Sequence, residues 1–213
     1  MNTKITNGVL VVLVVLALAV GIVAYFHLPD QIASHWNIRG EADDYLPKFW
    51  GVFLFPILMA GLFVLYLMIP KIDPLRANIQ SFRSYYNGFW ILLFAFFFYI
   101  LGLMLAWNFG HRFDFTAAMI PAVAALWYGI GMLLEKSRRN WFVGIRTPWT
   151  LSSDRVWEKT HKLGGALFKL AGGFALAGFL FDDGMVITAI IAIPAAAIAV
   201  ITIVYSYMEY RKQ

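Results

Sequence analysis

The sequence predicts an all-α integral membrane protein with six transmembrane helices. Of the 213 residues, 61% are hydrophobic and only 14% are charged, whereas a typical soluble domain has roughly 45–50% apolar and about 25% charged residues. The apolar residues gather in six runs, each near the roughly 20 residues that a helix needs to cross a bilayer. Lys and Arg concentrate in alternate connections between these runs. We therefore expect a multi-pass protein of the cell membrane.

The six expected spans follow directly from the apolar runs. They are Gly8–Phe26, Phe49–Ile69, Gly88–Asn108, Phe115–Leu134, Leu163–Phe181 and Met185–Met208. A β-barrel is disfavoured, because barrel strands alternate apolar and polar residues and these runs do not. The first run ends in the bulky residues 25–28, which do not form a signal-peptide cleavage site. We interpret it as a retained helix.

The distribution of Lys and Arg predicts the orientation. Thirteen of the seventeen lie before the first span, in the second and fourth connections, or after the last span. Only Arg39, Lys48 and Arg112 lie in the alternate connections. By the positive-inside rule, both termini are cytoplasmic. We expect two segments: residues 1–70, with the first two helices and an extracellular loop, and residues 71–213, with the other four helices and a long cytoplasmic segment.

The extracellular loop between the first two spans, residues 27–48, is longer than a bare connection requires. Ile32, Ser34 and Trp36 alternate with their neighbours, which predicts a short strand. Arg39-Gly40 then predicts a turn. The loop carries four acidic and two basic residues, so it is either a structured segment that receives a cationic ligand or a small cap on the helix ends. The residues alone favour the cap.

The cytoplasmic loop at residues 135–162 is the second long connection. Ser152 or Ser153 is suited to cap a helix, and Asp154 in its first turn favours the helix dipole. In that helix Trp157, His161 and Gly164 share one face. The segment is either a basic amphipathic surface on anionic lipid or a docking surface for a cytoplasmic protein.

The residues offer little chemistry of their own. The chain has no Cys, which excludes disulfides and thiolate metal sites. Glu158-x-x-His161 has the spacing of half a helical metal site, but the remaining ligands are missing, so we expect no metal, cofactor or enzymatic activity. The basic residues lie in short loops, so direct nucleic-acid binding is not expected. Lys169, the one charged residue in the six spans, is expected to extend to the cytoplasmic interface.

Two loop motifs resemble those of the SdpI family. Residues 28–37 read LPDQIASHWN and are followed by Gly40, Asp43 and Tyr45. Residues 140–151 read NWFVGIRTPWTL, and further matches follow at Ser153, Trp157, Thr160, His161 and Gly164. The first family motif has proline where this chain has Ala33, a departure expected to loosen the loop.

The resemblance implies a membrane immunity protein against a secreted cannibalism peptide toxin. It also implies signalling, in which the toxin-bound protein sequesters a small DNA-binding autorepressor at the membrane. Contacts with the toxin would come from the outer loop, at Asp30, His35, Trp36, Asn37 and Asp43. The repressor would dock on the inner side, at Arg146, Thr147, Pro148, Trp149, Trp157 and His161. Membrane lipids are the remaining expected partners.

Two other functions stay open at this point. A small facilitator or exporter would require a water-filled path near Lys169. An intramembrane enzyme acting on lipid or peptide would require Arg146 and His161 to converge in a cavity near the lipid headgroups.

Overall fold

A computed structural model describes residues 2–213, and this part of the chain contains six helices long and apolar enough to cross a membrane. They are α1 (Thr3–Tyr25), α2 (Lys48–Ile72), α4 (Arg83–Asn108), α5 (Phe115–Lys136), α7 (Asp154–Ala175) and α8 (Gly184–Tyr210). A short 3-10 helix, η1 (Leu176–Leu180), extends α7. The six predicted spans are thus confirmed, and the protein is a multi-pass protein of the cell membrane.

Helices α1 and α7 begin earlier than hydropathy predicts, and a polar residue caps each of them. The side chain of Asn2 accepts a hydrogen bond from the N–H of Lys4 and starts α1 five residues before the expected boundary. Ser153 caps α7, with Asp154 in the first turn, as predicted. The N-terminal turns of α7 lie before its apolar stretch, so hydropathy alone places its start too late.

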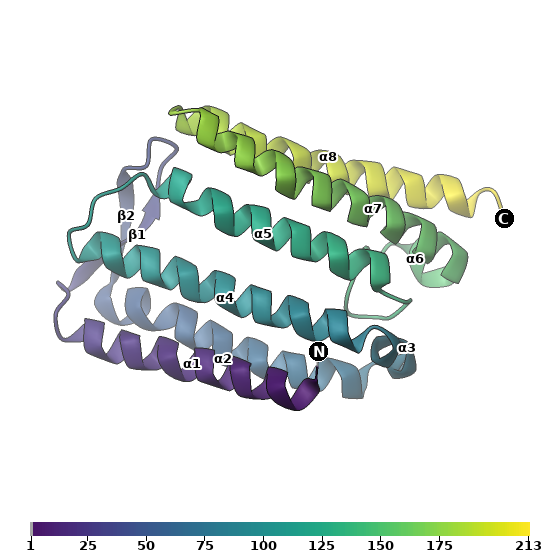
Figure 1. The fold of residues 1–213 in the computed structure, drawn as a ribbon, viewed down its shortest axis with the longest axis horizontal. Helices are drawn as coiled ribbons and strands as arrows, with labels where there is room; N and C mark the ends of the chain where they lie inside the picture. Colours follow the sequence, from purple (N-terminus) through teal and green to yellow (C-terminus); the bar gives the residue numbers. More distant parts are fainter. Residues whose placement is uncertain (1) are drawn as a thin grey trace.

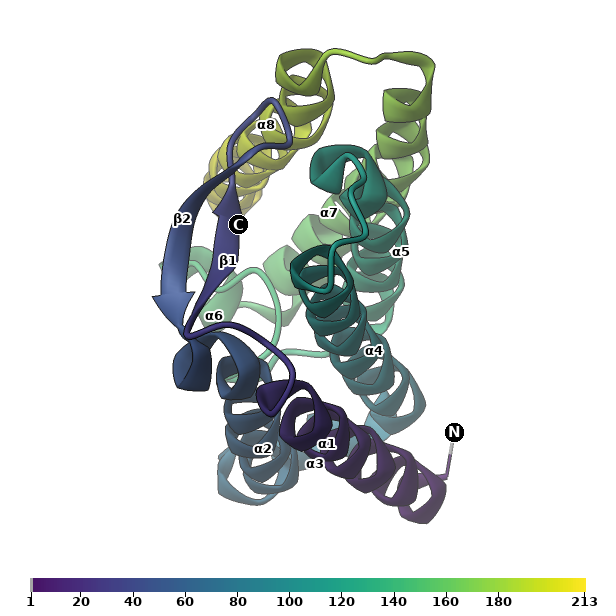
Figure 2. The ribbon, with the colours of Figure 1, turned by 90° about the vertical axis from the view of Figure 1, so that its left-hand side faces the viewer.

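The six helices run alongside one another, and both termini lie at the same end of the bundle (Figure 1). Figure 2 shows the bundle from the end opposite the termini. Helices α1, α2 and α4 share one hydrophobic core, whereas Trp127, Ala171 and Ile198 form a second core among α5, α7 and α8. We call these the first and second helix groups.

Small residues let α5 and α7 approach closely. A Cβ added at Gly172 would lie 2.7 Å from the carbonyl oxygen of Ala124, and one at Gly165 would lie 2.8 Å from that of Gly131. Ala171 and Ala175 are buried, as expected for small residues at a helix interface. Gly173 has no neighbour within 4 Å of an added Cβ, so it lies outside this seam.

A two-stranded antiparallel sheet connects α1 and α2. It consists of β1 (Gln31–Trp36) and β2 (Ala42–Pro47), with Gly40 at a φ of 71° in the turn. The predicted strand and turn are confirmed. We call the end of the bundle with this hairpin the hairpin end.

The opposite end carries the termini, α3 (Arg76–Ser81), α6 (Pro148–Ser152) and the loop between α5 and α6. Most Lys and Arg residues lie here, so we call it the basic end. Its assignment to the cytoplasm stays a prediction from the charge distribution, and so does the division at residue 70.

Candidate functional site

One polar side chain connects the hairpin to the bundle through two hydrogen bonds. Asn108, the last residue of α4, accepts a hydrogen bond from the N–H of Ala33 at 2.8 Å and donates one to the carbonyl oxygen of Ala33 at 3.0 Å. The adjacent Ile32 is fully buried against Gly51 of α2, where an added Cβ would overlap it. Ala33 is also fully buried, so it fixes the strand rather than loosening it, through an N–H that proline lacks.

Among the predicted toxin-contact residues, Asn37 has a structural role in the turn, whereas Asp30, His35 and Asp43 lie at the surface. Asn37 shapes the turn, because its Oδ1 accepts hydrogen bonds from the N–H groups of Arg39 and Glu41, at 2.8 and 3.2 Å. Asp30 lies 3.2 Å from Nζ of Lys48, although its side chain is almost fully exposed. His35 and Asp43 meet at 2.6 Å across the strands, and both stay largely exposed.

Trp36 lies between the hairpin and the helices. Its ring stacks on that of Phe115, with centroids 3.9 Å apart and planes 7° from parallel, and packs edge-on against Trp107. Its indole Nε1 is buried and has no hydrogen-bond partner among the described residues. A buried indole N–H usually has an acceptor, so Trp36 is the predicted contact residue whose hydrogen-bond donor is left unsatisfied.

At the basic end, Asn140 folds the loop after α5. This fully buried side chain accepts hydrogen bonds from the N–H groups of Phe142 and Val143 and donates to the carbonyl oxygens of Arg138 and Val143. Buried Asp73, just after α2, accepts from the N–H of Trp141 at 2.9 Å. The loop is therefore tied to both helix groups.

The predicted common face of Trp157, His161 and Gly164 is buried against this loop. His161 stacks on Trp157 at 3.9 Å. Its Nε2 accepts the N–H of Ile145 at 2.9 Å, and its Nδ1 lies 2.8 Å from the carbonyl oxygen of Trp157. These contacts require a neutral imidazole with its proton on Nδ1.

The turn into α6 joins the same cluster. Thr147 and Thr150 form a reciprocal capping box, and Pro148 occupies the first turn of α6. Oγ1 of Thr147 lies 3.1 Å from the hydroxyl of Ser206 on α8, and Trp149 packs on Tyr207. Arg146 is exposed and donates to the carbonyl oxygen of Trp141 at 2.7 Å.

The six predicted residues of the inner motif therefore have different roles. Thr147, Trp157 and His161 are buried and hold the fold, whereas Arg146 and Pro148 are exposed and Trp149 is half-buried. Glu158 is directed to Arg138, 3.9 Å away, and both ring nitrogens of His161 are engaged, so these two residues do not meet as metal ligands.

Lys169 is not an isolated charge within the spans. Its Nζ lies 2.6 Å from a carboxylate oxygen of Glu135 on α5. From its sequence position Lys169 is expected to extend to the cytoplasmic interface, and Glu135, which lies just beyond the predicted span that ends at Leu134, is not identified as its partner. A second cluster places Glu209, near the end of α8, 2.5 Å from both Lys159 and Lys212.

Sequence reasoning missed Asn108, Phe115 and Asn140 as organising residues. The sequence does show that Asn108 is an amide at the end of an apolar span and that Asn140 is an amide at the end of a basic stretch, which marks both as candidates for capping backbone groups. Nothing in their spacing indicates which backbone groups they bind.

The fold and these two sites define a multi-pass cell-membrane protein with a docked hairpin at one end and a folded basic motif at the other. Residues 136–206 match the model of the SdpI/YfhL protein family, and residues 12–60 match a model described as a domain of unknown function, DUF1648. The chain is 26% identical over 212 residues to the immunity protein SdpI of Bacillus subtilis (strain 168), which covers 97% of this chain and 96% of that protein. These matches confirm the resemblance to the SdpI family. No solved structure matches the chain.

Proposed function

We propose that this protein is a non-enzymatic membrane immunity protein that protects its cell from a secreted peptide toxin. The observation that carries the proposal is similarity to an immunity protein along almost the whole chain. The similarity covers both terminal and internal segments, so it includes the hairpin and the basic-end motif together.

The hairpin is the proposed toxin-contact site. Its backbone is fixed by Asn108, while His35 and Asp43 remain exposed. Trp36 presents a buried N–H without an acceptor beside them. A rigid surface with unsatisfied and exposed polar groups suits recognition, because little ordering entropy is lost on binding.

The exposed part of the basic-end motif is the proposed signalling site. Arg146, Pro148 and Trp149 form an accessible turn on a scaffold that Thr147, Trp157 and His161 hold. Arg and Trp are enriched in protein interfaces, so this turn suits a cytoplasmic protein such as the autorepressor that the family resemblance implies.

Survival of a toxin-sensitive bacterium tests the proposal. Cells that express the protein are challenged with the cannibalism peptide, alongside cells that express Trp36→Ala, with membrane insertion checked by fractionation. We expect protection by the natural protein and its loss in Trp36→Ala. Absence of protection at confirmed expression would contradict the immunity function, and full protection by an inserted Trp36→Ala protein would remove Trp36 from the contact site.

An Arg146→Ala variant separates the two ends of the molecule. If Arg146 acts in signalling, this variant protects cells but fails to induce the operon that the repressor controls. Loss of protection together with induction would instead place Arg146 in the protective mechanism itself.

The two other functions have less support. The ion pair with Glu135 gives Lys169 a structural partner, whereas a transport path would need it to face water. His161 is 1% exposed with both ring nitrogens engaged, and Arg146 is bound to Trp141 at the surface. These two residues do not form the shared cavity that the enzyme hypothesis needs.

A further inference from the structure

An apolar hollow lies beneath the hairpin, between the two helix groups. Its volume is about 290 Å³. Every spanning helix that borders it contributes apolar side chains: Phe55 from α2, Ile100 and Met104 from α4, Phe115 and Met119 from α5, and Ile191 from α8. Ser34, His35 and Trp36 of β1 form its roof.

Two of the helices that line the hollow, α2 and α8, lie apart on the side of the bundle that the hairpin crosses (Figure 2). Phe55 and Ile191 each lie seven residues into their helices, which corresponds to a depth of about 10 Å at 1.5 Å per residue. The hollow therefore lies at the depth of an apolar segment in the outer part of the bilayer.

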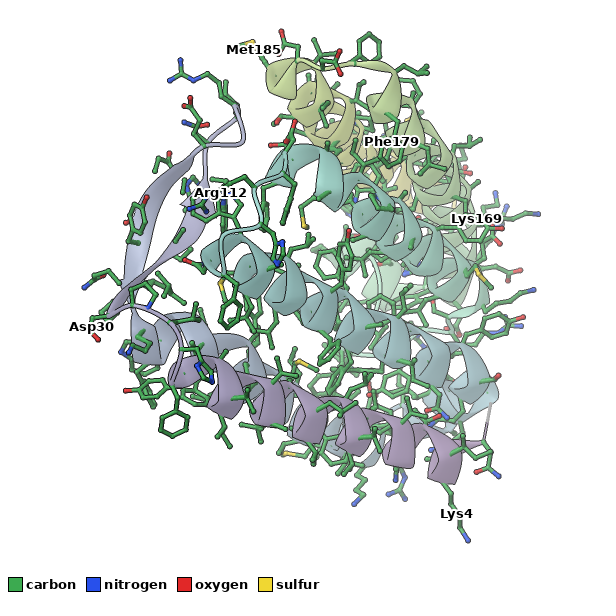
Figure 3. All side chains as sticks on the ribbon, turned by 60° about the vertical axis from the view of Figure 1, so that its left-hand side comes forward. Lys4, Asp30, Arg112, Lys169, Phe179 and Met185 are labelled. Carbon is green, nitrogen blue, oxygen red and sulfur yellow. The ribbon has the colours of Figure 1, made fainter. Side chains whose placement is uncertain are left out.

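A second hollow lies at the tip of the hairpin. It has a volume of about 820 Å³ and is lined by residues 37–39 of the hairpin tip, Asp114, and residues 182–185. The linings of the two hollows are neighbours in the chain, because Trp36 precedes Asn37 and Asp114 precedes Phe115. Figure 3 shows the hairpin extending from Asp30 to a tip near Met185, at the start of α8.

The outer hollow is acidic. Asp114, Asp182 and Asp183 line it together with Arg39, and the hairpin end as a whole carries seven acidic residues against three Lys or Arg. Asp114 and Asp183 already accept hydrogen bonds from the first N–H groups of α5 and α8. This charge disfavours an anionic lipid headgroup and favours a cation.

We infer that the two hollows together bind an amphipathic peptide, with its apolar segment beneath the hairpin and a Lys or Arg of the peptide in the acidic outer hollow. The inference rests on the proposed immunity function and identifies where and how the toxin is held. Trp36 lines the inner hollow next to Asn37 of the outer hollow, and its buried, unpaired Nε1–H donates a hydrogen bond to a peptide carbonyl oxygen.

Filling the inner hollow tests this arrangement. Ile191→Trp places an indole in the hollow, whereas Ile193→Trp makes the same change on the lipid-facing side of α8, where residue 193 is 66% exposed. The probe is the fluorescently labelled cannibalism peptide, titrated onto the purified full-length protein in zwitterionic lipid nanodiscs. We expect Ile191→Trp to weaken binding at least tenfold and Ile193→Trp to change it less than twofold.

The acidic hollow provides a second variant that leaves the core untouched. Asp182→Asn removes a charge in the hollow, and Asp44→Asn removes one from β2 outside it. We expect threefold to tenfold weaker binding for Asp182→Asn at low salt, with the difference shrinking at high salt, and no such change for Asp44→Asn.

Survival of cells that express the same variants distinguishes this inference from the proposed function. Protection by the natural protein, with equal peptide affinity in Ile191→Trp and Asp182→Asn, would overturn the hollow as binding site and leave immunity standing. Neither protection nor binding by the natural protein would overturn both. If mass spectrometry detects a retained lipid that Ile191→Trp displaces while peptide affinity is unchanged, the hollow holds lipid and the inference is wrong.

Discussion

Gly144 determines whether the basic-end motif can form. It has a φ of 129°, a conformation that L side chains rarely adopt, and an added Cβ would overlap Nε2 of His161 and lie 3.0 Å from the ring of Trp157. The loop can therefore pass over the stacked Trp157–His161 pair only as glycine.

We expect Gly144→Ala to destabilise the protein by about 2 kcal/mol, from backbone strain and displacement of His161. Thermal unfolding in detergent, followed by Trp fluorescence, should show a midpoint lower by roughly 4–8 °C. Gly173→Ala is the control, because nothing lies within 4 Å of its added Cβ. An unchanged midpoint for Gly144→Ala would mean that the loop does not pack on His161 in this way.

The ion pair between Lys169 and Glu135 yields a prediction about the stability of the protein. The two side chains are only 31% and 26% exposed, so removing one leaves the other poorly compensated. We expect Lys169→Met to cost about 1–2 kcal/mol, and the double variant Lys169→Met/Glu135→Gln to recover most of it. Thermal unfolding of the natural protein, Lys169→Met, Glu135→Gln and the double variant measures the coupling energy between the two side chains. Additive effects of the two substitutions would contradict a direct ion pair.

Among single residues, the helical ones are the most predictable from sequence. The 3.6-residue period alone places Trp157, His161 and Gly164 on one helix face, and all three are buried. Their partners, the carbonyl of Ser137 and the N–H of Ile145, belong to an irregular loop. The course of that loop depends on hydrogen bonds of Asn140 and Asp73 that sequence periodicity does not encode.

Among the elements, the hairpin is the one whose position matters most for function. Strand alternation and Arg39-Gly40 predict that it exists, but its register contains irregularities between Ala33 and Trp36. Ala33 contacts Asn108 and Trp36 stacks on Phe115. Docking between residues 75 positions apart is set by tertiary contacts, so the local pattern leaves open whether the loop is a cap or a binding segment.

We expect Asn108→Ala to loosen the hairpin, because two hydrogen bonds to Ala33 are lost. A loss of about 1–2 kcal/mol corresponds to roughly 5–30-fold faster amide exchange. Hydrogen–deuterium exchange in nanodiscs should show this change at residues 31–47. Asn78→Ala, which removes a bond to the carbonyl oxygen of Arg139 at the basic end, should leave those residues unchanged, and equal protection in both variants would refute the role of Asn108.

At the scale of the whole molecule, hydropathy predicts the six spans but not their two groups. Hydropathy reports which segments enter lipid, and every span has an apolar surface whether it faces lipid or protein. The neighbours are set by close contacts such as Gly131 with Gly165 and by the aromatic core around Tyr66 and Trp90. Close packing of two helices depends on both surfaces together, so the pattern of a single segment does not predict its neighbours.

Because the chain has no Cys, single cysteines can test its orientation cleanly. We expect Asp44→Cys on the hairpin to react with a membrane-impermeant maleimide in intact cells. Lys4→Cys and Gln213→Cys, near the two termini, should react only after permeabilisation, since the positive-inside rule places the basic end in the cytoplasm. The opposite labelling pattern would reverse the assigned topology.

The contact between the hairpin tip and the start of α8 has a consequence for membrane insertion. The tip rests on Gly184, where an added Cβ would overlap the carbonyl oxygen of Ile38, yet Gly184 follows Ile38 by 146 positions. At translation rates of about 5–20 residues per second, the translocated strands wait roughly 7–30 s before the last helix arrives. A nascent chain stopped before α8 lacks both the contact of the hairpin tip with Gly184 and the part of the inner hollow that Ile191 lines, so the outer face is completed only when α8 has been inserted.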